Sequence, residues 1–165
     1  MSTILNTNGA ELNIPTPLKT NYSFDIVTAE WNPEVTHALR DGAVDVLLKA
    51  GIPAKMIRSW SVPGTVELVN AAAAIHAKGG SNGIIVIGCV IRGDTPHFDY
   101  VCQQVAQGTA ELNARGKTPV TFGVLTVDNL QQALDRAGGS LGNKGAEAGC
   151  VAIDMANLHT KILFP

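Results

Sequence analysis

Six consecutive residues, from Arg92 to His97, gather a cation, a carboxylate, a hydroxyl and an imidazole in a chain that has few charges. They follow directly on Gly83–Ile91, an apolar run made almost wholly of Gly, Ile and Val. Residues 93–95 lead into a helical pattern, and the free N–H groups at a helix N-terminus attract anions. The segment therefore indicates an anion-binding loop or, as the simpler alternative, only the capped start of a helix.

Histidine is the side chain that most readily gives and takes a proton near neutral pH. His97 occupies the first turn of an expected helix, beside the candidate anion loop. The other three histidines, His37, His76 and His159, fall inside expected helices, where a packed or solvated role suits them better. We therefore expect His97 to be the acid–base group if the protein is an enzyme.

A second cationic segment, DRAGGSLGNKG at residues 135–145, joins two expected helices. It is not a P-loop, because no strand precedes it and Asn143 separates Gly142 from Lys144. Arg136 and Lys144 on a flexible connection would suit a phosphate carried by a substrate, or would simply be solvated. The sequence has no metal-ligand spacing and no nucleophile beside a base, so the substrate must bring its own nucleophile.

Composition limits the class of protein. The chain has 165 residues, of which 45% are hydrophobic and 16% charged, and net charge −2. So few charges, where about 25% is usual, predict a surface given over to subunit contacts. No basic cluster suggests nucleic acid, and no apolar run suggests a signal peptide or a membrane span. Cysteines at 89, 102 and 150 are expected to be buried thiols in a reducing cytoplasm.

Strand and helix patterns alternate four times, which predicts an α/β fold with a parallel sheet covered by helices on both faces. We expect residues 1–20 to be an N-terminal arm and residues 21–165 to be a single domain. The expected strands are Tyr22–Ala29, Lys55–Val62, Gly83–Ile91 and Thr118–Val127. The expected helices run from about Pro33 to Gly51, Thr65 to Lys78, Pro96 to Leu112, Asn129 to Gly138 and Gly142 to Leu163. Three of them have expected N-caps, at Asn32, Thr95 and Asp128.

Ligands of an open parallel sheet bind beyond the carboxyl ends of its strands. Trp31 follows the first expected strand, Glu67 follows the second and His97 follows the third. An aromatic plane, a carboxylate and an imidazole are therefore expected on one rim. This combination favours a ligand with an aromatic ring and a phosphate.

Three segments, in the order VPGTVEL, GCVIRGDTPHFDYVC and LDRAGGSLGNKGAEAG, closely resemble the lumazine synthase family. The likeness runs from about Tyr22 to Leu158. It implies a flavodoxin-like, three-layer α/β/α sandwich around a four-stranded parallel sheet. It also implies the penultimate step of riboflavin biosynthesis, in which 5-amino-6-ribitylaminouracil and 3,4-dihydroxy-2-butanone 4-phosphate give 6,7-dimethyl-8-ribityllumazine, phosphate and water. The aminouracil supplies the nucleophilic amine, and neither a cofactor nor a metal is implied.

By motif, the resemblance assigns proton transfer to His97 and substrate binding to a larger set. Ring and ribityl chain would be held by Trp31, Asn32, Thr65, Val66 and Glu67, with backbone groups of Cys89, Val90 and Ile91; the phosphate would be cradled by Gly93, Asp94 and Thr95; and Phe122, Arg136 and Lys144 would come from a neighbouring subunit. Many relatives have alanine or serine where this chain has Asp94, so we expect a lower phosphate affinity.

The resemblance also implies a homo-pentamer with its sites at subunit interfaces, and in many members twelve pentamers form an icosahedral shell of 60 subunits. The unbroken GNKG turn favours the shell, whereas Pro15 and Pro17 cannot donate to a strand ladder in the arm. Riboflavin synthase is an expected partner. Two alternatives remain open: a flavin- or lumazine-binding or shell-forming relative without turnover, and a flavodoxin-like electron carrier. The presence of His97, Arg136 and Glu67 favours the enzyme.

Overall fold

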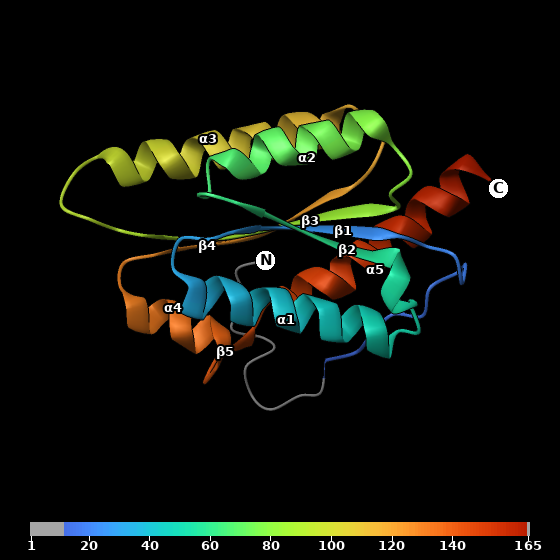
Figure 1. Cartoon of the computed structure of the whole chain (residues 1–165), viewed down its shortest axis with the longest axis horizontal. Helices are drawn as coiled ribbons and strands as arrows, with labels where there is room; N and C mark the ends of the chain where they lie inside the picture. Colours follow the sequence, from blue (N-terminus) through green and yellow to red (C-terminus); the bar gives the residue numbers. More distant parts are fainter. Residues whose placement is uncertain (1–11, 165) are drawn as a thin grey trace.

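The computed structural model describes residues 12–164 and folds them into three layers around one sheet (Figure 1). The sheet has the strand order β2-β1-β3-β4, and all three pairings are parallel. Its strands are β1 (Phe24–Ala29), β2 (Ile57–Val62), β3 (Gly83–Ile91) and β4 (Val120–Val127). The expected α/β class and four-stranded parallel sheet are therefore confirmed.

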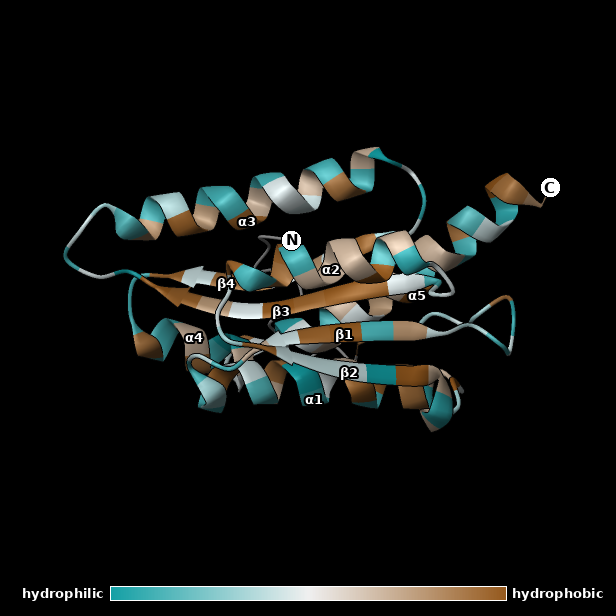
Figure 2. Ribbon diagram, turned by 45° about the horizontal axis from the view of Figure 1, so that its top comes forward, coloured by the Kyte–Doolittle hydropathy of each residue, from teal (hydrophilic) through white to brown (hydrophobic). Residues whose placement is uncertain are grey.

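Helices cover both faces of this sheet (Figures 1 and 2). The helices on one face are α1 (Pro33–Lys49), α4 (Leu130–Arg136) and α5 (Lys144–Leu163), and those on the other are α2 (Glu67–Lys78) and α3 (His97–Ala114). Alternate residues of β1 serve the two faces, because successive strand side chains point in opposite directions. Phe24 and Ile26 pack with α1 and α5, whereas Val27 and Ala29 pack with α2 and α3.

Three of the four strands begin two residues later than expected, while β3 has the expected bounds. Tyr22 and Ser23, before β1, are buried without joining the ladder; the Tyr22 hydroxyl, for example, bonds Thr160 at 2.6 Å. A 3-10 turn at Ala54–Met56 takes up the expected start of β2. Before β4 stands Pro119, which has no N–H to donate. Buried residues therefore extend beyond the paired strand, so a strand start predicted from apolar residues alone comes too early.

Two predicted helix N-caps were wrong. Asn129, not Asp128, caps α4, and its side-chain oxygen accepts from Gln132 N at 3.0 Å. Helix α3 begins at His97 with Pro96 as its N-cap, one residue later than a cap at Thr95 would place it. Neighbouring Asp, Asn and Thr residues all have capping oxygens, so the sequence does not distinguish between them.

The glycine-rich connection between α4 and α5 is a small hairpin rather than the end of one helix and the start of the next. Its strands are β5 (Ala137–Gly139) and β6 (Gly142–Asn143), which pair antiparallel. Gly138 and Gly142 have φ of +113° and +73°, which non-glycine residues rarely adopt. These two positions reverse the chain and direct α5 back along α1.

The described part of the N-terminal arm lies on α5 of its own chain. Leu18 N donates to Asn157 Oδ1 at 2.8 Å, and Asn157 Nδ2 donates to Thr16 O at 3.0 Å. Leu12 and Ile14 pack against the core. Residues 1–11, over half of the expected arm, lie outside the described residues, and the expected domain boundary stays a prediction. None of the helices within residues 12–164 is long and apolar enough to cross a membrane.

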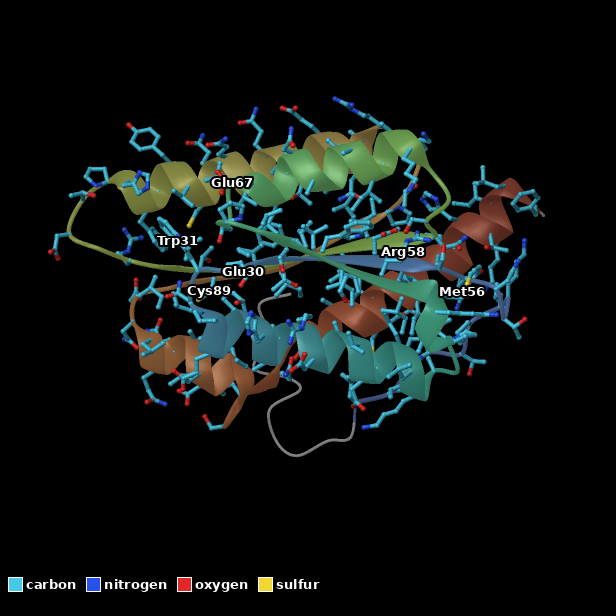
Figure 3. All side chains as sticks on the ribbon, viewed as in Figure 1. Glu30, Trp31, Met56, Arg58, Glu67 and Cys89 are labelled. Carbon is cyan, nitrogen blue, oxygen red and sulfur yellow. The ribbon has the colours of Figure 1, made fainter. Side chains whose placement is uncertain are left out.

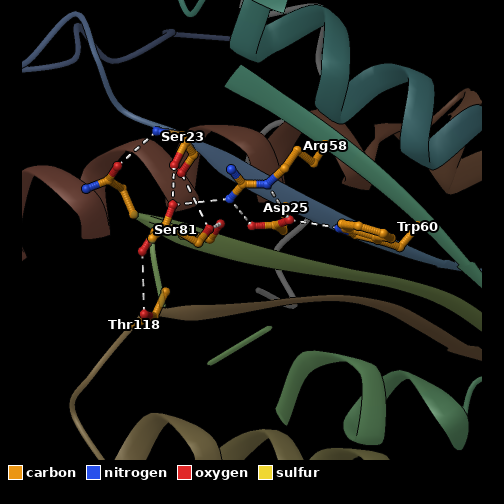
Figure 4. Close-up of polar contacts among 9 residues, drawn as sticks. Ser23, Asp25, Arg58, Trp60, Ser81 and Thr118 are labelled. Carbon is orange, nitrogen blue, oxygen red and sulfur yellow. Dashed lines mark hydrogen bonds and ion pairs between the residues drawn. The ribbon is translucent and has the colours of Figure 1, made fainter. Parts of the chain in front are cut away.

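A buried carboxylate joins β1 to the edge strand β2 near their amino ends (Figure 4). The Asp25 side chain is only 2% exposed. Arg58 donates to both of its oxygens, at 2.8 and 2.6 Å, and Trp60 Nε1 donates at 2.8 Å. Burial alone would raise the pKa of Asp25, but hydrogen bonds from Arg58, Trp60 and Ser81 hold that pKa below its usual value.

We expect Arg58→Met to lower the free energy of unfolding at neutral pH by about 1.5–3 kcal/mol, because it leaves a buried carboxylate without its guanidinium. The folded-state pKa of Asp25 lies below its usual 3.8, so this group stabilises the wild type above about pH 4 and the contribution is lost as the pH falls through the lowered pKa. The difference between wild type and variant should therefore shrink in acid.

Urea denaturation at pH 7 and at pH 3 measures both effects. Lys49→Met is the matched control, since Lys49 and Asp45 form a 2.7 Å pair of exposed side chains. Its loss should stay near 0.5 kcal/mol or less. A difference for Arg58→Met that stays constant between the two pH values would contradict the proposed origin of the effect.

Candidate active site

The topology places a crevice between the carboxyl ends of β1 and β3. The crossover from β1 to β2 contains α1, and the crossover from β3 to β4 runs the opposite way along the sheet and contains α3 on the other face. Such a switch point is where open parallel sheets bind ligands. Figure 3 shows Trp31, Glu67 and Cys89 at this end of the molecule, with Arg58 and Met56 at the other.

Trp31 provides an open aromatic surface at this crevice. It lies between β1 and α1, and 71% of its surface is exposed. A tryptophan this exposed in a domain with a full core has no packing role in the described residues, and its indole face is free to stack on a planar ring. The structure thus places Trp31 where the sequence predicted an aromatic platform.

Asn32 precedes α1, as expected, but its side chain does not cap the helix. Its backbone carbonyl accepts from Val35 N at 2.9 Å and from Thr36 N at 3.0 Å, while the side-chain Nδ2 donates to Cys89 O at 3.0 Å. Asn32 also has a left-handed backbone, with φ 58° and ψ 54°. The expected capping position is correct, but the side chain instead reaches β3.

The start of α2 approaches the end of β3 because Gly88 has no side chain. A Cβ at Gly88 would lie 2.9 Å from Thr65 Oγ1. Thr65 is buried, Val66 is the N-cap residue of α2 and Glu67 is exposed in its first turn. The expected residues at 65–67 are therefore brought beside Cys89, and the Glu67 carboxylate is open to a ligand.

The loop from β3 to α3 exposes most of the residues expected to hold phosphate. Gly93, Asp94, Thr95 and His97 are all exposed, and a Cβ at Gly93 would meet nothing within 4 Å. The N-cap of α3 makes no side-chain hydrogen bond. Asp99 N donates to Pro96 O at 3.0 Å, which leaves the N–H groups of His97 and Phe98 available to an anion, beside the His97 side chain.

Arg92 is the cation of this loop, but it is already paired. Its guanidinium lies 4.1 Å from the centre of the Phe98 ring, and it reaches Asp99 at 3.3 Å and Asp128 at 3.2 Å. These contacts hold the end of β3 to the end of β4 and to α3. Sequence reasoning missed this arrangement, because Asp128 looked like a helix cap.

Glu30 and His37 are a second feature of the rim that sequence reasoning missed. Their side chains approach to 3.6 Å beside Trp31. A hydrogen bond from Ser61 lowers the pKa of Glu30, and the charge of His37 lowers it further. His76 has the packed role expected of it, since it is buried in α2, where its ring nitrogen accepts from Thr118 N at 3.4 Å.

Cys89 and Cys150 are buried, as expected, whereas Cys102 is only half-buried. Burial raises the pKa of Cys89 to about 11, so its thiol stays protonated at neutral pH and is a poor nucleophile. Burial likewise raises the pKa of Cys150 to about 11. At the end of β3, the backbone carbonyl of Cys89 accepts from Asn32 Nδ2, and Val90 and Ile91 follow it in the strand.

Within one chain, Phe122 lies away from this crevice, whereas Arg136 and Lys144 are bonded within their own helices. Phe122 pairs with Val86 in the sheet, three residues before the Leu125–Cys89 pair, or about 10 Å along the strand. It lines a groove of about 380 Å³ along the free edge of β4. Arg136 donates to the carbonyl of Gln132 in its own helix, at 2.9 Å.

Lys144 is not on a flexible connection, contrary to the expectation from sequence. It is the first residue of α5, and its ammonium lies 2.6 Å from Glu147. The two side chains are only 14% and 11% exposed. An i, i+3 pair this enclosed is an internal contact of the helix, so any support that Lys144 gives to a phosphate is indirect.

The comparisons with known proteins agree on one family. The model of a protein family described as 6,7-dimethyl-8-ribityllumazine synthase matches residues 21–160, a range that contains every expected site residue. A relative of that name from Phocaeicola vulgatus is 47% identical over 146 residues, which cover 88% of this chain and 87% of the relative. One from Porphyromonas gingivalis is 51% identical, covering 81% and 83%, and one from Bacteroides fragilis is 52% identical, covering 80% and 92%.

Proposed function

Because the chain belongs to the 6,7-dimethyl-8-ribityllumazine synthase family, and is thereby a transferase of riboflavin biosynthesis, we propose that its reaction takes place in the crevice between β1 and β3. The substrates would be 5-amino-6-ribitylaminouracil and 3,4-dihydroxy-2-butanone 4-phosphate. One observation supports this location of the reaction: the exposed indole of Trp31 and the open start of α3 with His97 lie at the same switch point. A planar ring and a phosphate are the ligands that these two features suit.

The chain's own groups would bind and orient the reactants rather than attack them. The amine of the aminouracil attacks the ketone and releases water to form an imine, and phosphate is then eliminated. Tautomerisation and attack of the ribitylamino nitrogen close the second ring and release another water. His97 would carry protons between these steps, and Glu67 would position the ribitylaminouracil. Holding two reactive molecules together supplies most of the acceleration in such a case.

We further propose that each site is completed by a neighbouring subunit of a homo-pentamer, with Phe122 closing the aromatic slot and Arg136 holding the phosphate. The position of Phe122 on the free edge of β4, away from its own crevice, supports this arrangement. The same proposal includes assembly into a 60-subunit shell, association with riboflavin synthase and a cytoplasmic location. It also includes a lowered phosphate affinity caused by Asp94.

The deciding experiment follows lumazine formation and phosphate release together from the two substrates. Equal amounts of lumazine and phosphate, formed well above the uncatalysed rate, would support the proposed reaction. No acceleration combined with tight riboflavin binding would instead favour a ligand-binding relative without turnover. Trp31→Ala provides the internal check, because loss of the stacking plane should weaken the binding of the aminouracil in the first case and of riboflavin in the second.

Arg136→Ala should raise KM for the butanone phosphate about tenfold to a hundredfold with a smaller change in kcat, since a hydrogen bond to a charged group is lost. Lys161→Ala is the control, because that lysine is exposed near the far end of α5. An unchanged KM would contradict the assignment of Arg136.

Mixed pentamers test whether the site is shared. Subunits with Trp31→Ala and subunits with Arg136→Ala, refolded together, should recover about a quarter of wild-type sites if one residue comes from each of two neighbours. No recovery would mean that both residues serve the same subunit's site.

A further inference from the structure

The two sides of the crevice separate at a definite point in the sheet. The ladder between β1 and β3 ends at Thr28–Ile87, whereas β3 continues beside β4 as far as Ile91–Val127. Beyond Thr28 the chain parts from β3, although it stays beside β2 as far as the Ala29–Val62 pair. It then forms one wall of the crevice, and the last residues of β3 form the other. The relative position of the two walls is no longer set by backbone pairing between these strands.

One side chain joins these walls. Among the hydrogen bonds that residues 30–32 make within the described chain, the bond from Asn32 Nδ2 to Cys89 O, at 3.0 Å, is the one that reaches β3. Glu30 is bonded in the other direction, since its N–H donates to Val62 O of β2 at 2.9 Å. The segment that carries Trp31 is thus held from both sides.

The backbone at Asn32 is adapted to this contact. It is the one non-glycine residue with positive φ in the described chain. Asparagine tolerates the left-handed region better than most residues. The left-handed turn lets the carbonyl of Asn32 accept from the first N–H groups of α1 while the side chain points back to β3. One residue therefore links β1, the start of α1 and β3.

We propose that Asn32 is a positioning residue, which sets the place of the Trp31 indole relative to the carboxyl end of β3 before substrate binds. The proposal rests on the function proposed above, in which Trp31 stacks on the pyrimidine ring. It differs from the sequence expectation, in which Asn32 itself holds the substrate. An exposed side chain that is held in its binding position by the protein loses less freedom when a ligand arrives.

Two variants separate the donor from the backbone. Asn32→Gly keeps the left-handed turn and removes the side chain, whereas Asn32→Asp keeps the shape and replaces the donor by a carboxylate facing the Cys89 carbonyl. Asn129→Asp is the matched control, because it adds the same charge at the same end of the sheet while aspartate still caps α4.

The decisive readout is taken without substrate, from the ¹H–¹⁵N signals of the two indoles in full-length protein. Trp31→Phe assigns the signals. We expect both Asn32 variants to shift or broaden the Trp31 signal and to leave that of Trp60, which bonds Asp25 near the opposite end of the sheet, in place. KM for the aminouracil should rise about twofold to tenfold, the effect of one hydrogen bond, with kcat changed less.

A raised KM with an unchanged Trp31 signal would overturn the proposal, because Asn32 would then act on the substrate directly. A shifted signal with an unchanged KM would also overturn it, since the position of Trp31 would not matter to binding. Absence of lumazine formation by the wild type is a separate failure, of the proposed reaction. In that case riboflavin affinity replaces KM, and the substrate-free spectra keep their meaning.

Discussion

Gly145→Ala should lower the free energy of unfolding by about 3 kcal/mol or more, the upper range for an overpacked core, and yield little folded protein. Gly145 is buried at the start of α5, and a Cβ there would overlap the backbone carbonyl of Leu39 in α1. The backbone of α1 cannot rotate away from the added Cβ as a side chain could. Asn143 Nδ2 also donates to Ala38 O at 2.9 Å, which holds the two helices together at this point.

The control for this variant lies one turn further along α5. A Cβ at Gly149 would meet Ala43 O and Val46 at about 3.1 Å, a tight contact that small shifts can relieve. Gly149→Ala should therefore cost clearly less, about 1 kcal/mol. Urea denaturation followed by circular dichroism ranks the two variants and wild type. If Gly145→Ala were as stable as wild type, α1 and α5 could not approach as closely as described.

His97→Ala should lower kcat by about a hundredfold, with 10⁴-fold as the ceiling, and leave KM for both substrates nearly unchanged. The imidazole is exposed in the first turn of α3, where it can reach a bound reactant, and Cys89 cannot replace it because burial keeps that thiol protonated. The proposed steps need a group that moves protons but not one that forms a bond to carbon. The effect should therefore appear in kcat.

Steady-state kinetics with both substrates varied, and phosphate release as a second signal, measures this effect. Lys161→Ala is again the control, since Lys161 is exposed near the far end of α5. Added imidazole should restore part of the activity of His97→Ala, because the exposed position leaves room for it. If the variant instead lost substrate binding at unchanged kcat, His97 would be a binding residue.

Much of the candidate site was predictable because its residues lie in short segments whose pattern is visible in the sequence. Trp31, Glu67 and His97 each follow an expected strand, and parallel strands bring such positions to one end of the sheet. The long segments around these residues also resemble a known family at the level of sequence. Capping residues were less predictable, as Asp128 and Asn129 show, because both offer an oxygen to the same helix start.

By itself, the sequence determined the α/β class, the bounds of β3, the family and the end of the sheet at which Trp31, Glu67 and His97 lie. Those properties follow from apolar runs, helical spacing and contiguous motifs, and each of these involves residues that are close together in the sequence. The tertiary structure decided what several polar side chains do. Asn32 reaches Cys89 across 57 positions, Arg92 is shared by Asp99 and Asp128, and Lys144 is enclosed with Glu147. Hydrogen bonds and ion pairs depend on distances of a few ångströms between elements, and only packing sets those distances.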